Sequence, residues 1–582
     1  MSETDQSAAD QSDAADGIPP GKRLVRAGGG AGLSLGERMA AHFYRLTWRT
    51  PFHKLRLRGR YPLKLLAAPH DPVAGNPEAG LAIVQGQLLL QGESVALGDG
   101  GPDLTGSSPA LVAYYHSFGW LRDLAVAGTQ AEIAPFAESL MRSWLAAHGE
   151  SVSEPAWSAG NAGARLLNWP LYGPYILASP DIVYRSEVLN CLARTARHAD
   201  QIADRTPPGL ERIAAWSGVV AAGLLIAGGD PRRAYGEAGL SKALASATSD
   251  DGGLTSRSPH EQMALVEMFA KLHAIYASRE LAIPEAIAVV ASRAVPALLG
   301  VVLGDGGLSS WQGAAPLPAA AIDAVVAASG ERSRALRQAR DWGYQRMSGG
   351  QTILIFDAAP PPHSRSTRNG CASTLAFEMS DGAHRLVVNC GGAAAAGLHS
   401  ISGLAEGLRT TAAHSTLTLA DTNSTAVLIN GSLGRGVDEV ELDRQETDTG
   451  SRVEASHDGY ARRFGFTHRR ALALSVDGRE VRGEDTLVPV GGRRKPAEAH
   501  FAVRFHLALG IDVAPTADGL GALLRIDGGP LWQFRCRGGA LAVEPSLWVD
   551  GNGKWHQTHQ LVIAGETASG GATIGWVFKR AG

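Results

Sequence analysis

The sequence has few cysteines, no long apolar run and no strong excess of charge of either sign. Its 582 residues include four cysteines and no CxxC pair, so neither a disulfide framework nor a zinc ribbon is predicted. A formal net charge of −3 argues against a broad nucleic-acid or membrane footprint. No stretch of about 18 apolar residues occurs, so no membrane-spanning helix is expected.

The N-terminal stretch, residues 1–34, begins with a polar and acidic run that reads MSETDQSAADQSDAAD. Such a composition cannot bury enough apolar surface to fold alone, so we expect a disordered tail over this range. The stretch also lacks the apolar segment of a secretory signal. A cytoplasmic location is therefore expected.

Residues 35–345 and 346–582 differ in the period of their apolar residues. The first range is rich in Ala and Leu with helical spacing, as in QAEIAPFAESLMRSWLAAHG at 130–149. The second range alternates polar and apolar residues in short runs, as in HFAVRFHLA at 500–508. The chain length also requires more than one core. We predict an α+β multidomain chain: an N-terminal (α/α) toroid of helical hairpins, a linking helix at 331–350, and a C-terminal antiparallel β-sandwich.

An Asp-Gly-Gly loop occurs twice in the helical part, as SDDGGLTS at 249–256 and LGDGGLSS at 303–310. Each copy lies between two predicted helices. A recurring loop of this kind favours an array of helical hairpins. The alternative is that Asp-Gly-Gly is only a good turn sequence.

Six stretches resemble, in the same order, motifs of the heparinase II/III superfamily of polysaccharide lyases. They are NAGARLLNWPLYGPYIL, AAWSGVVAAGLLIAG, DGGLTSRSPHEQ, NGCASTLAFEMSDGAHRLVVNCG, RTTAAHSTLTLADT and SHDGYARRFGFTHRR. The resemblance implies β-elimination on uronate polysaccharides. That chemistry needs donors that neutralise the uronate carboxylate and a Tyr or His that transfers the proton.

The chain departs from the superfamily pattern at several functional positions. The usual Asn-Asn-His is replaced by Ala214, Ala215 and Trp216, and a usual Tyr by Glu261. Where relatives hold a structural zinc, the corresponding residues here are Cys371, Asn389 and His414. Since Asn is a poor zinc ligand, a structural zinc is possible and not expected, and no cofactor is predicted.

Six residues are candidates for a catalytic role: His414, Tyr460, His457, Glu261, His260 and Asn369. His414 stands at the mouth of a predicted strand and matches the superfamily motif. Tyr460 and His457 lie together in SHDGYARR and could form an acid–base pair. The alternative is structural: a polar strand end, a hydrogen-bonded corner, and a carboxylate in the first turn of a helix.

Six more residues are candidates for substrate binding: Arg165, Asn168, Trp169, Tyr172, Arg365 and Arg409. The first four are spaced along one helix face, where aromatic rings could stack on sugars and polar groups could bind a carboxylate. The two arginines suit bidentate binding of carboxylate or sulfate, and Arg368 lies in the same loop as Arg365. Arg469 and Arg470 are expected as strand-surface charges.

The preferred function is a lyase-like enzyme that cleaves an acidic, uronate-containing polysaccharide or oligosaccharide by β-elimination. The alternatives are a non-catalytic glycan-binding or envelope-associated protein and a glycoside hydrolase on the same scaffold. No nucleic-acid partner is expected. The oligomeric state is left open, and the periplasm or cell envelope is the alternative location, as in similar lyases.

Overall fold

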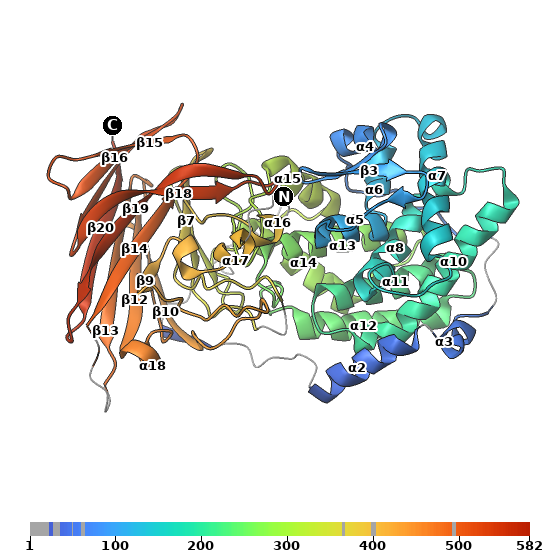
Figure 1. Cartoon of the computed structure of the whole chain (residues 1–582), viewed down its shortest axis with the longest axis horizontal. Helices are drawn as coiled ribbons and strands as arrows, with labels where there is room; N and C mark the ends of the chain where they lie inside the picture. The colour runs from blue at the N-terminus through green and yellow to red at the C-terminus, as the bar shows by residue number, and fades with distance from the viewer. Residues whose placement is uncertain are drawn as a thin grey trace, which may run out of the picture.

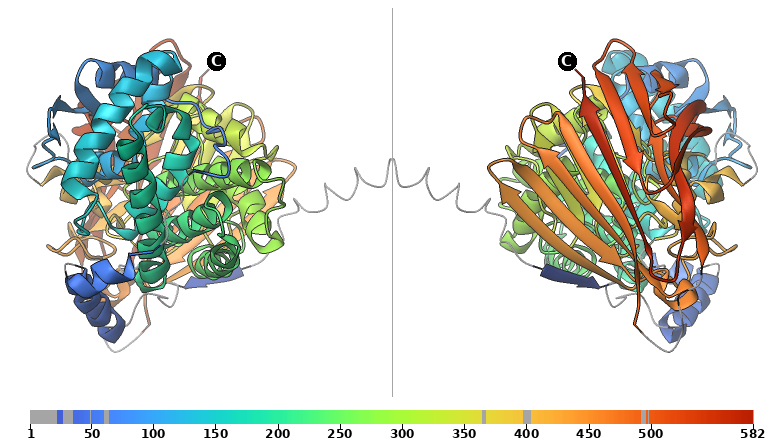
Figure 2. Two further views of the ribbon diagram at one scale, coloured as in Figure 1. Left: turned by 90° about the vertical axis from the view of Figure 1, so that its right-hand side faces the viewer. Right: turned by 90° about the vertical axis from the view of Figure 1, so that its left-hand side faces the viewer.

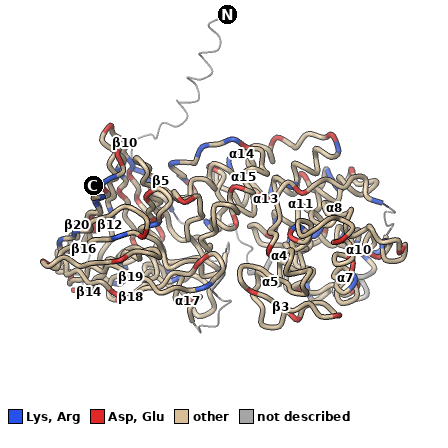
Figure 3. Tube along the Cα trace, turned by 90° about the horizontal axis from the view of Figure 1, so that it is seen from above, with Lys and Arg blue, Asp and Glu red and all other residues tan. Residues whose placement is uncertain are grey.

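A helical half and a strand-rich half lie side by side in the chain (Figure 1). The computed structural model describes residues 22–26, 35–48, 50–59, 64–363, 367–396, 403–491, 496 and 498–581. The first half is a toroid-like array of helices and the second an antiparallel β-sandwich. The predicted fold class is therefore confirmed. Basic and acidic residues are interspersed along both halves (Figure 3).

Short sequence signals fix the ends of many helices in the first half. Helix α7 (Gln130–His148) begins with a capping box, in which Glu132 accepts a hydrogen bond from the backbone N–H of Thr129 at 2.9 Å. The other main helices are α2 (Leu35–Thr47), α3 (Pro51–Arg56), α4 (Pro77–Val84), α5 (Pro109–Ser117), α6 (Trp120–Ala125), α8 (Ala159–Leu171), α9 (Gly173–Ile176), α10 (Ile182–Ile202), α11 (Leu210–Leu225), α12 (Asp230–Ala247), α13 (Pro259–Ala277), α14 (Glu285–Gly300) and α15 (Ala319–Ser329). A small sheet, β2 (Gln87–Leu90), β3 (Glu93–Gly98) and β4 (Gly101–Pro102), lies between α4 and α5.

Helices α8 and α11 pack closely through two glycines. A Cβ atom on Gly163 would lie 2.1 Å from the carbonyl oxygen of Ala214, and one on Gly218 would lie 2.7 Å from the Cα of Gly163. No side chain fits at either position. The close approach buries nearly all of α11, including Ala214, Ala215 and Trp216.

The two Asp-Gly-Gly loops have the same backbone pairing. Thr248 bridges Leu254 in the first loop, and Val302 bridges Leu308 in the second. The loops connect α12 to α13 and α14 to α15. This shared geometry favours the interpretation as repeated helical hairpins.

The sandwich consists of two antiparallel sheets. The nine-stranded sheet contains, in spatial order, β1 (Lys22–Arg26), β10 (Glu439–Thr447), β11 (Gly450–His457), β12 (Phe466–Ser475), β13 (Glu480–Pro489), β20 (Ala572–Arg580), β17 (Leu531–Arg537), β16 (Gly521–Ile526) and β15 (Ile511–Pro515). The eight-stranded sheet contains β18 (Ala540–Val549), β19 (Trp555–Thr567), β14 (Ala499–Leu507), β8 (His384–Val388), β7 (Phe377–Asp381), β6 (Thr352–Asp357) and β5 (Tyr344–Gly349), with β9 (Leu417–Leu419) paired to β14. Alternate side chains of both sheets face a common apolar core that includes Phe377, Phe505 and Trp576.

Two expectations about the ends of the domains are wrong. Residues 22–26, expected in a disordered tail, form strand β1, which adds to the edge of the nine-stranded sheet beside β10 (Figure 2, right). The stretch 331–343, expected as a linking helix, is not helical, because its backbone bonds outward to Pro296 and Tyr344 instead of along itself. The remainder of the expected tail lies outside the described residues.

Arg257 fastens the first Asp-Gly-Gly loop to the sandwich. Its guanidinium donates to the carbonyl of Trp342 at 2.8 Å, to the carbonyl of Pro360 at 2.8 Å and to the Asp357 carboxylate at 2.6 Å. The side chain is 7% exposed. These buried hydrogen bonds, all donated by a charged guanidinium, hold the helical half against the sandwich. No helix among the described residues is both long and apolar enough to cross a membrane.

Candidate functional site

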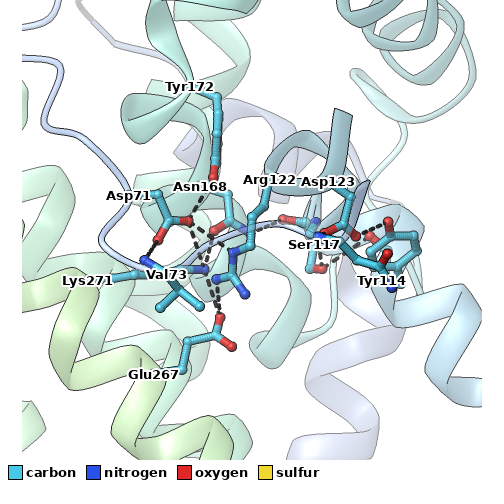
Figure 4. A network of polar contacts seen from close by, with 12 residues as sticks. Asp71, Val73, Tyr114, Ser117, Arg122, Asp123, Asn168, Tyr172, Glu267 and Lys271 are labelled. Carbon is cyan, nitrogen blue, oxygen red and sulfur yellow. Dashed lines mark hydrogen bonds and ion pairs between the residues drawn. The ribbon is translucent and has the colours of Figure 1, made fainter. Parts of the chain in front are cut away.

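Four charged side chains form a compact cluster inside the helical domain (Figure 4). Asp71 comes from the loop before α4, Arg122 from α6, and Glu267 and Lys271 from α13. The Arg122 guanidinium contacts both Asp71 and Glu267, and the Lys271 ammonium lies 3.0 Å from Glu267 and 3.9 Å from Asp71. Two cations are therefore matched by two carboxylates of the chain itself.

Asn168 and Tyr172, both predicted for substrate binding, belong to this cluster. The Asn168 side-chain oxygen accepts from Lys271 at 2.7 Å, and its amide nitrogen donates to the carbonyl of Ser117 at 2.9 Å. The Tyr172 hydroxyl donates to Asp71 at 2.9 Å. The structure thus brings these two residues together, with their polar groups already bonded inside the protein.

The ion pairs determine the charge states of the cluster. Burial opposes the charge of Glu267, but Arg122 and Lys271 outweigh it and hold the pKa of Glu267 well below its usual range. Burial, followed by the negative charge of Asp71, raises the pKa of Tyr172. Tyr172 is therefore a neutral hydrogen-bond donor, and Glu267 an ionised partner of two cations.

Arg165 and Trp169 lie on the same helix but in an aromatic core. The Arg165 guanidinium sits 4.6 Å from the ring centroid of Trp144 and 5.0 Å from that of Trp157, and it donates to the carbonyl of Ala156 at 2.8 Å. Arg165 is fully buried, which lowers its pKa to about 10. Trp169 is 1% exposed. The predicted open face is therefore absent at these two residues, and neither ring nor guanidinium is offered to a sugar.

His260 and Glu261 occupy the first turn of α13, as the sequence predicts. Both side chains are partly exposed. Desolvation lowers the pKa of His260. Desolvation, and then the nearby carboxylate of Glu211, raises the pKa of Glu261. Glu261 and His260 are therefore predicted catalytic residues that keep contact with solvent, and Glu261 binds a proton more readily than an ordinary carboxylate.

The sandwich candidates near the domain junction divide into exposed and buried residues. Asn369 is exposed on a loop beside Gly313. Arg409 is 7% exposed, and its Nε donates to the carbonyl of Gly370 at 2.8 Å. Arg365 lies outside the described residues. Arg409 therefore braces the loop that carries Asn369.

His414 is buried directly before strand β9. Its Nδ1 lies 2.7 Å from the carbonyl oxygen of Thr410, so the ring donates to its own turn. Burial lowers the pKa of His414 to about 4. At neutral pH this histidine is an uncharged structural donor inside the sandwich.

His457 and Tyr460 also have structural partners. The Tyr460 hydroxyl donates to the carbonyl of Leu417 at 2.9 Å, and burial raises its pKa. The Nε2 atom of His457 lies 3.3 Å from Nδ1 of His468, which in turn contacts Asp485 at 2.7 Å. Both predicted proton-transfer residues are 2% exposed or less. They belong to the hydrogen-bonded corner that was the structural alternative.

The residues at the superfamily's zinc positions form hydrogen bonds within the protein. The Cys371 thiol donates to the carbonyl of Asn369 at 3.4 Å, and the amide nitrogen of Asn389 donates to Glu378 at 3.0 Å. His414 is bonded to Thr410, as described above. Within the described ranges, no group of three or more His, Cys, Asp or Glu side chains could hold a metal ion.

Asn168, Glu261, Asn369 and His414 do not share partners. Asn168 bonds inside the helical domain, Glu261 faces Glu211, Asn369 lies on an exposed loop, and His414 bonds within its own turn. The arrangement provides an ion-paired cluster and a partly exposed carboxylate, without a shared proton-transfer site.

Comparisons with known proteins place the chain among its relatives. FtsZ-localized protein C of Caulobacter vibrioides (strain NA1000 / CB15N) is 30% identical over 574 residues, which cover 93% of this chain and 95% of that protein. The model of the heparinase II/III-like C-terminal domain matches residues 331–577. The chain belongs to the heparinase II/III superfamily.

Solved structures of the superfamily share the fold over nearly the whole chain. Heparinase III superposes with a TM-score of 0.68 at 15% identity, covering 93% of this chain and 89% of that one. A mutant of heparan sulfate lyase HepC from Pedobacter heparinus superposes with a TM-score of 0.60 at 14% identity, covering 94% and 88%. At this identity the likeness concerns the fold alone.

Sequence reasoning missed Asp71, Arg122, Glu267 and Lys271. A usable signal was present on α13, where Glu267 and Lys271 are spaced four residues apart within the apolar run ALVEMFAKLHAIYA. No local pattern pairs them with Asp71 or Arg122, which are more than 140 residues away along the chain.

Proposed function

We propose that this chain is a non-catalytic binding protein on a heparinase scaffold and that it works with FtsZ at the division site. The partner class is suggested by FtsZ-localized protein C, which matches over 95% of its own length. The loss of catalysis is supported above all by one observation. The cations nearest to Asn168 are neutralised by Asp71 and Glu267 of the chain itself.

Elimination on a uronate needs a free donor for the substrate carboxylate and a base near the sugar. Both polar atoms of Asn168 already have partners, and Arg122 and Lys271 are ion-paired. A substrate carboxylate would have to displace one of these internal carboxylates. Such an exchange would leave Asp71 or Glu267 without its cation, which opposes it although the cluster is partly exposed.

The proposal has two tests with separate readouts. Heparan sulfate, hyaluronan, alginate and polygalacturonate are incubated with the protein, and we expect no ultraviolet absorbance from unsaturated uronates. A fluorescent fusion is expected to colocalise with FtsZ, and the purified chain to sediment with FtsZ polymers. A diffuse fusion that stays in the supernatant contradicts the division role, whatever the absorbance assay gives.

A cytoplasmic location is part of this proposal, with the periplasm or cell envelope as the alternative. Fractionation of cells that express the fusion distinguishes the two. Recovery of the fusion with periplasmic markers would contradict the cytoplasmic assignment.

A second candidate function is β-elimination on an acidic polysaccharide or oligosaccharide. It is favoured by Glu261, a partly exposed carboxyl with a raised pKa beside His260. In that case one of the four polymers gives rising absorbance, and Glu261→Gln removes the rise. Release of reducing ends without absorbance would instead favour a hydrolase.

A further inference from the structure

Residues 22–64 form a strongly basic segment of the chain. This segment holds 11 of the 54 Lys and Arg residues and 1 of the 57 Asp and Glu residues. The net charge of −3 therefore conceals a strongly basic segment in an otherwise acidic chain. The whole-chain charge, on which the expectation of no broad membrane footprint rests, does not reveal this asymmetry.

Helix α2, within this segment, is held to the helical domain by one face. The Tyr44 hydroxyl donates to Gln201 at 2.8 Å, and Trp48 is 5% exposed against the rings of His53 and His198. Arg45 forms an ion pair with Glu154 at 3.1 Å. These contacts fix the orientation of the helix at the lower edge of the domain (Figures 1 and 2).

The opposite face of α2 is apolar and uncovered. Met39, Phe43 and Leu46 are spaced by four and three residues, which places them on one side of the helix. They are 54%, 61% and 59% exposed. In α3, which follows, His53 is buried and Leu55 is a further exposed apolar side chain, at 61%.

Exposed cations follow this apolar face in the chain. The side chains of Arg56, Arg58 and Lys64 are exposed, and no acidic side chain occurs in the sequence between Glu37 and Asp71. Large apolar groups with surrounding Arg and Lys characterise helices that lie in the interface of an anionic bilayer. Apolar groups insert below the headgroups while the cations meet lipid phosphates.

We propose that α2 and α3 form a docking surface for an anionic lipid bilayer. A second copy of the chain is a poorer occupant, because a symmetric contact would bring two basic segments together. A nucleic acid would use the cations but leave Phe43 and Leu46 without an apolar partner. The inference is independent of the division role and of any glycan chemistry.

The test uses the full chain and vesicle flotation. We expect the protein to float with vesicles of phosphatidylglycerol and phosphatidylethanolamine, not with phosphatidylcholine alone, and to release as salt rises. The double substitution Phe43→Ser and Leu46→Ser should weaken binding at least about tenfold. Both side chains are exposed, so the thermal midpoint should not change.

Matched apolar residues elsewhere provide the control. Ile182 and Val183, at the start of α10 beside Asp181, are 69% and 68% exposed and lie outside the basic segment. Changing both to Ser should leave flotation unchanged. Equal losses in the two double variants, or no loss at α2, would overturn the proposal.

A charge variant and a measurement of association complete the test. Arg56→Glu with Arg58→Glu should lower binding to anionic vesicles and reduce its salt dependence. Sedimentation equilibrium of the Phe43→Ser, Leu46→Ser protein should match that of the unmodified chain. A shift toward monomer in a protein that never floats with vesicles would assign the surface to self-association and refute lipid docking.

Discussion

The helical domain and the sandwich each contain a network of buried charges, and the two differ in their access to solvent. In the helical domain, the side chains of Glu267 and Arg122 are 24% and 16% exposed. In the sandwich, His468, Arg470 and Asp485 are wholly buried. Water reaches part of the first network and screens its charges, so its ion pairs should contribute less to stability than those of the sealed network.

The sandwich network connects the two sheets. Asp485 accepts from His468 and Arg470 at 2.7 Å and from the Trp576 ring nitrogen at 2.8 Å. Arg470 also donates to the carbonyls of Leu375 and Ser415, both at 2.7 Å. Arg470, expected on the strand surface, therefore links β12 to segments of the facing half of the sandwich. Its role is architectural.

The largest expected effect follows from removing the charge of Asp485. Asp485→Asn leaves the Arg470 guanidinium buried without its counter-ion, so we expect a loss of about 3–5 kcal/mol in the free energy of unfolding. Urea denaturation at pH 7 measures the change. The loss should exceed that of any single substitution in the helical cluster.

Asp518 is the matched control for this substitution. It pairs with Arg535 at 2.7 Å, but the two side chains are 45% and 40% exposed. Asp518→Asn should leave the free energy of unfolding almost unchanged, because surface ion pairs contribute little. Similar losses for Asp485 and Asp518 would contradict the distinction between sealed and exposed charges.

A second prediction concerns acid sensitivity and His414. Burial lowers the pKa of His414 from 6.5 to about 4, so the unfolded chain takes up a proton there before the folded chain does. The stability due to this histidine is complete above pH 6.5 and is lost as the pH falls toward 4. Its share is about 3 kcal/mol.

The substitution His414→Asn isolates this contribution. The Asn amide can still donate near Thr410 but does not titrate, so stability should fall less steeply from pH 7 to pH 4.5 than in the unmodified chain. Urea midpoints across this range give the two slopes, and their difference separates His414 from other titrating groups. Parallel slopes would show that His414 is already accessible to protons.

A third prediction tests the helical cluster. Lys271→Met removes one of two cations, leaves Glu267 and Asp71 with Arg122 alone, and takes a donor from Asn168. We expect a loss of about 2 kcal/mol, less than at Asp485 because water reaches Glu267. The double variant Lys271→Met, Glu267→Gln should recover part of this loss, since it restores charge balance.

Chemical denaturation of the two single variants and the double variant completes a thermodynamic cycle. A coupling energy near zero would show that Lys271 and Glu267 act independently. In that case the cations would be free to meet a ligand carboxylate, and the argument against catalysis would lose its main support.

The sequence predicts helices and strands better than it predicts the tertiary contacts of their side chains. The alternation over 466–475 correctly indicates a strand and puts Arg470 on the same face as Phe466 and Leu472. A charged residue is expected inside only with a partner, and that partner, Asp485, is 15 residues away and invisible to the local pattern. The helical spacing of Arg165, Asn168 and Trp169 correctly indicates one helix, and Tyr172 directly follows its last residue. It does not reveal that the rings and cations of other helices cover that helix.

Long-range pairing explains the other differences. Strand β1 forms because Lys22–Arg26 meet an open edge more than 400 residues later in the chain. The sequence predicts that Arg257 lies in a loop. It does not predict its role at the domain junction, because that role depends on carbonyls 85 and 103 residues away. Periodicity carries no information about such contacts, whereas the resemblance in motif order predicted the fold because it spans both domains.

The smallest expected effect is at Glu261, the partly exposed counterpart of the sealed groups. Because folding raises its pKa, the ionised form is disfavoured in the folded state at pH 7. Glu261→Gln should therefore be neutral or stabilising by about 0.5 kcal/mol at pH 7, and the gain should vanish near pH 3, where the carboxyl is protonated in both states. Urea denaturation at the two pH values measures the difference. A loss above about 1 kcal/mol would show that Glu261 stabilises the start of α13. The enzymatic alternative would then lose its supporting observation, because Glu261 would have a structural role.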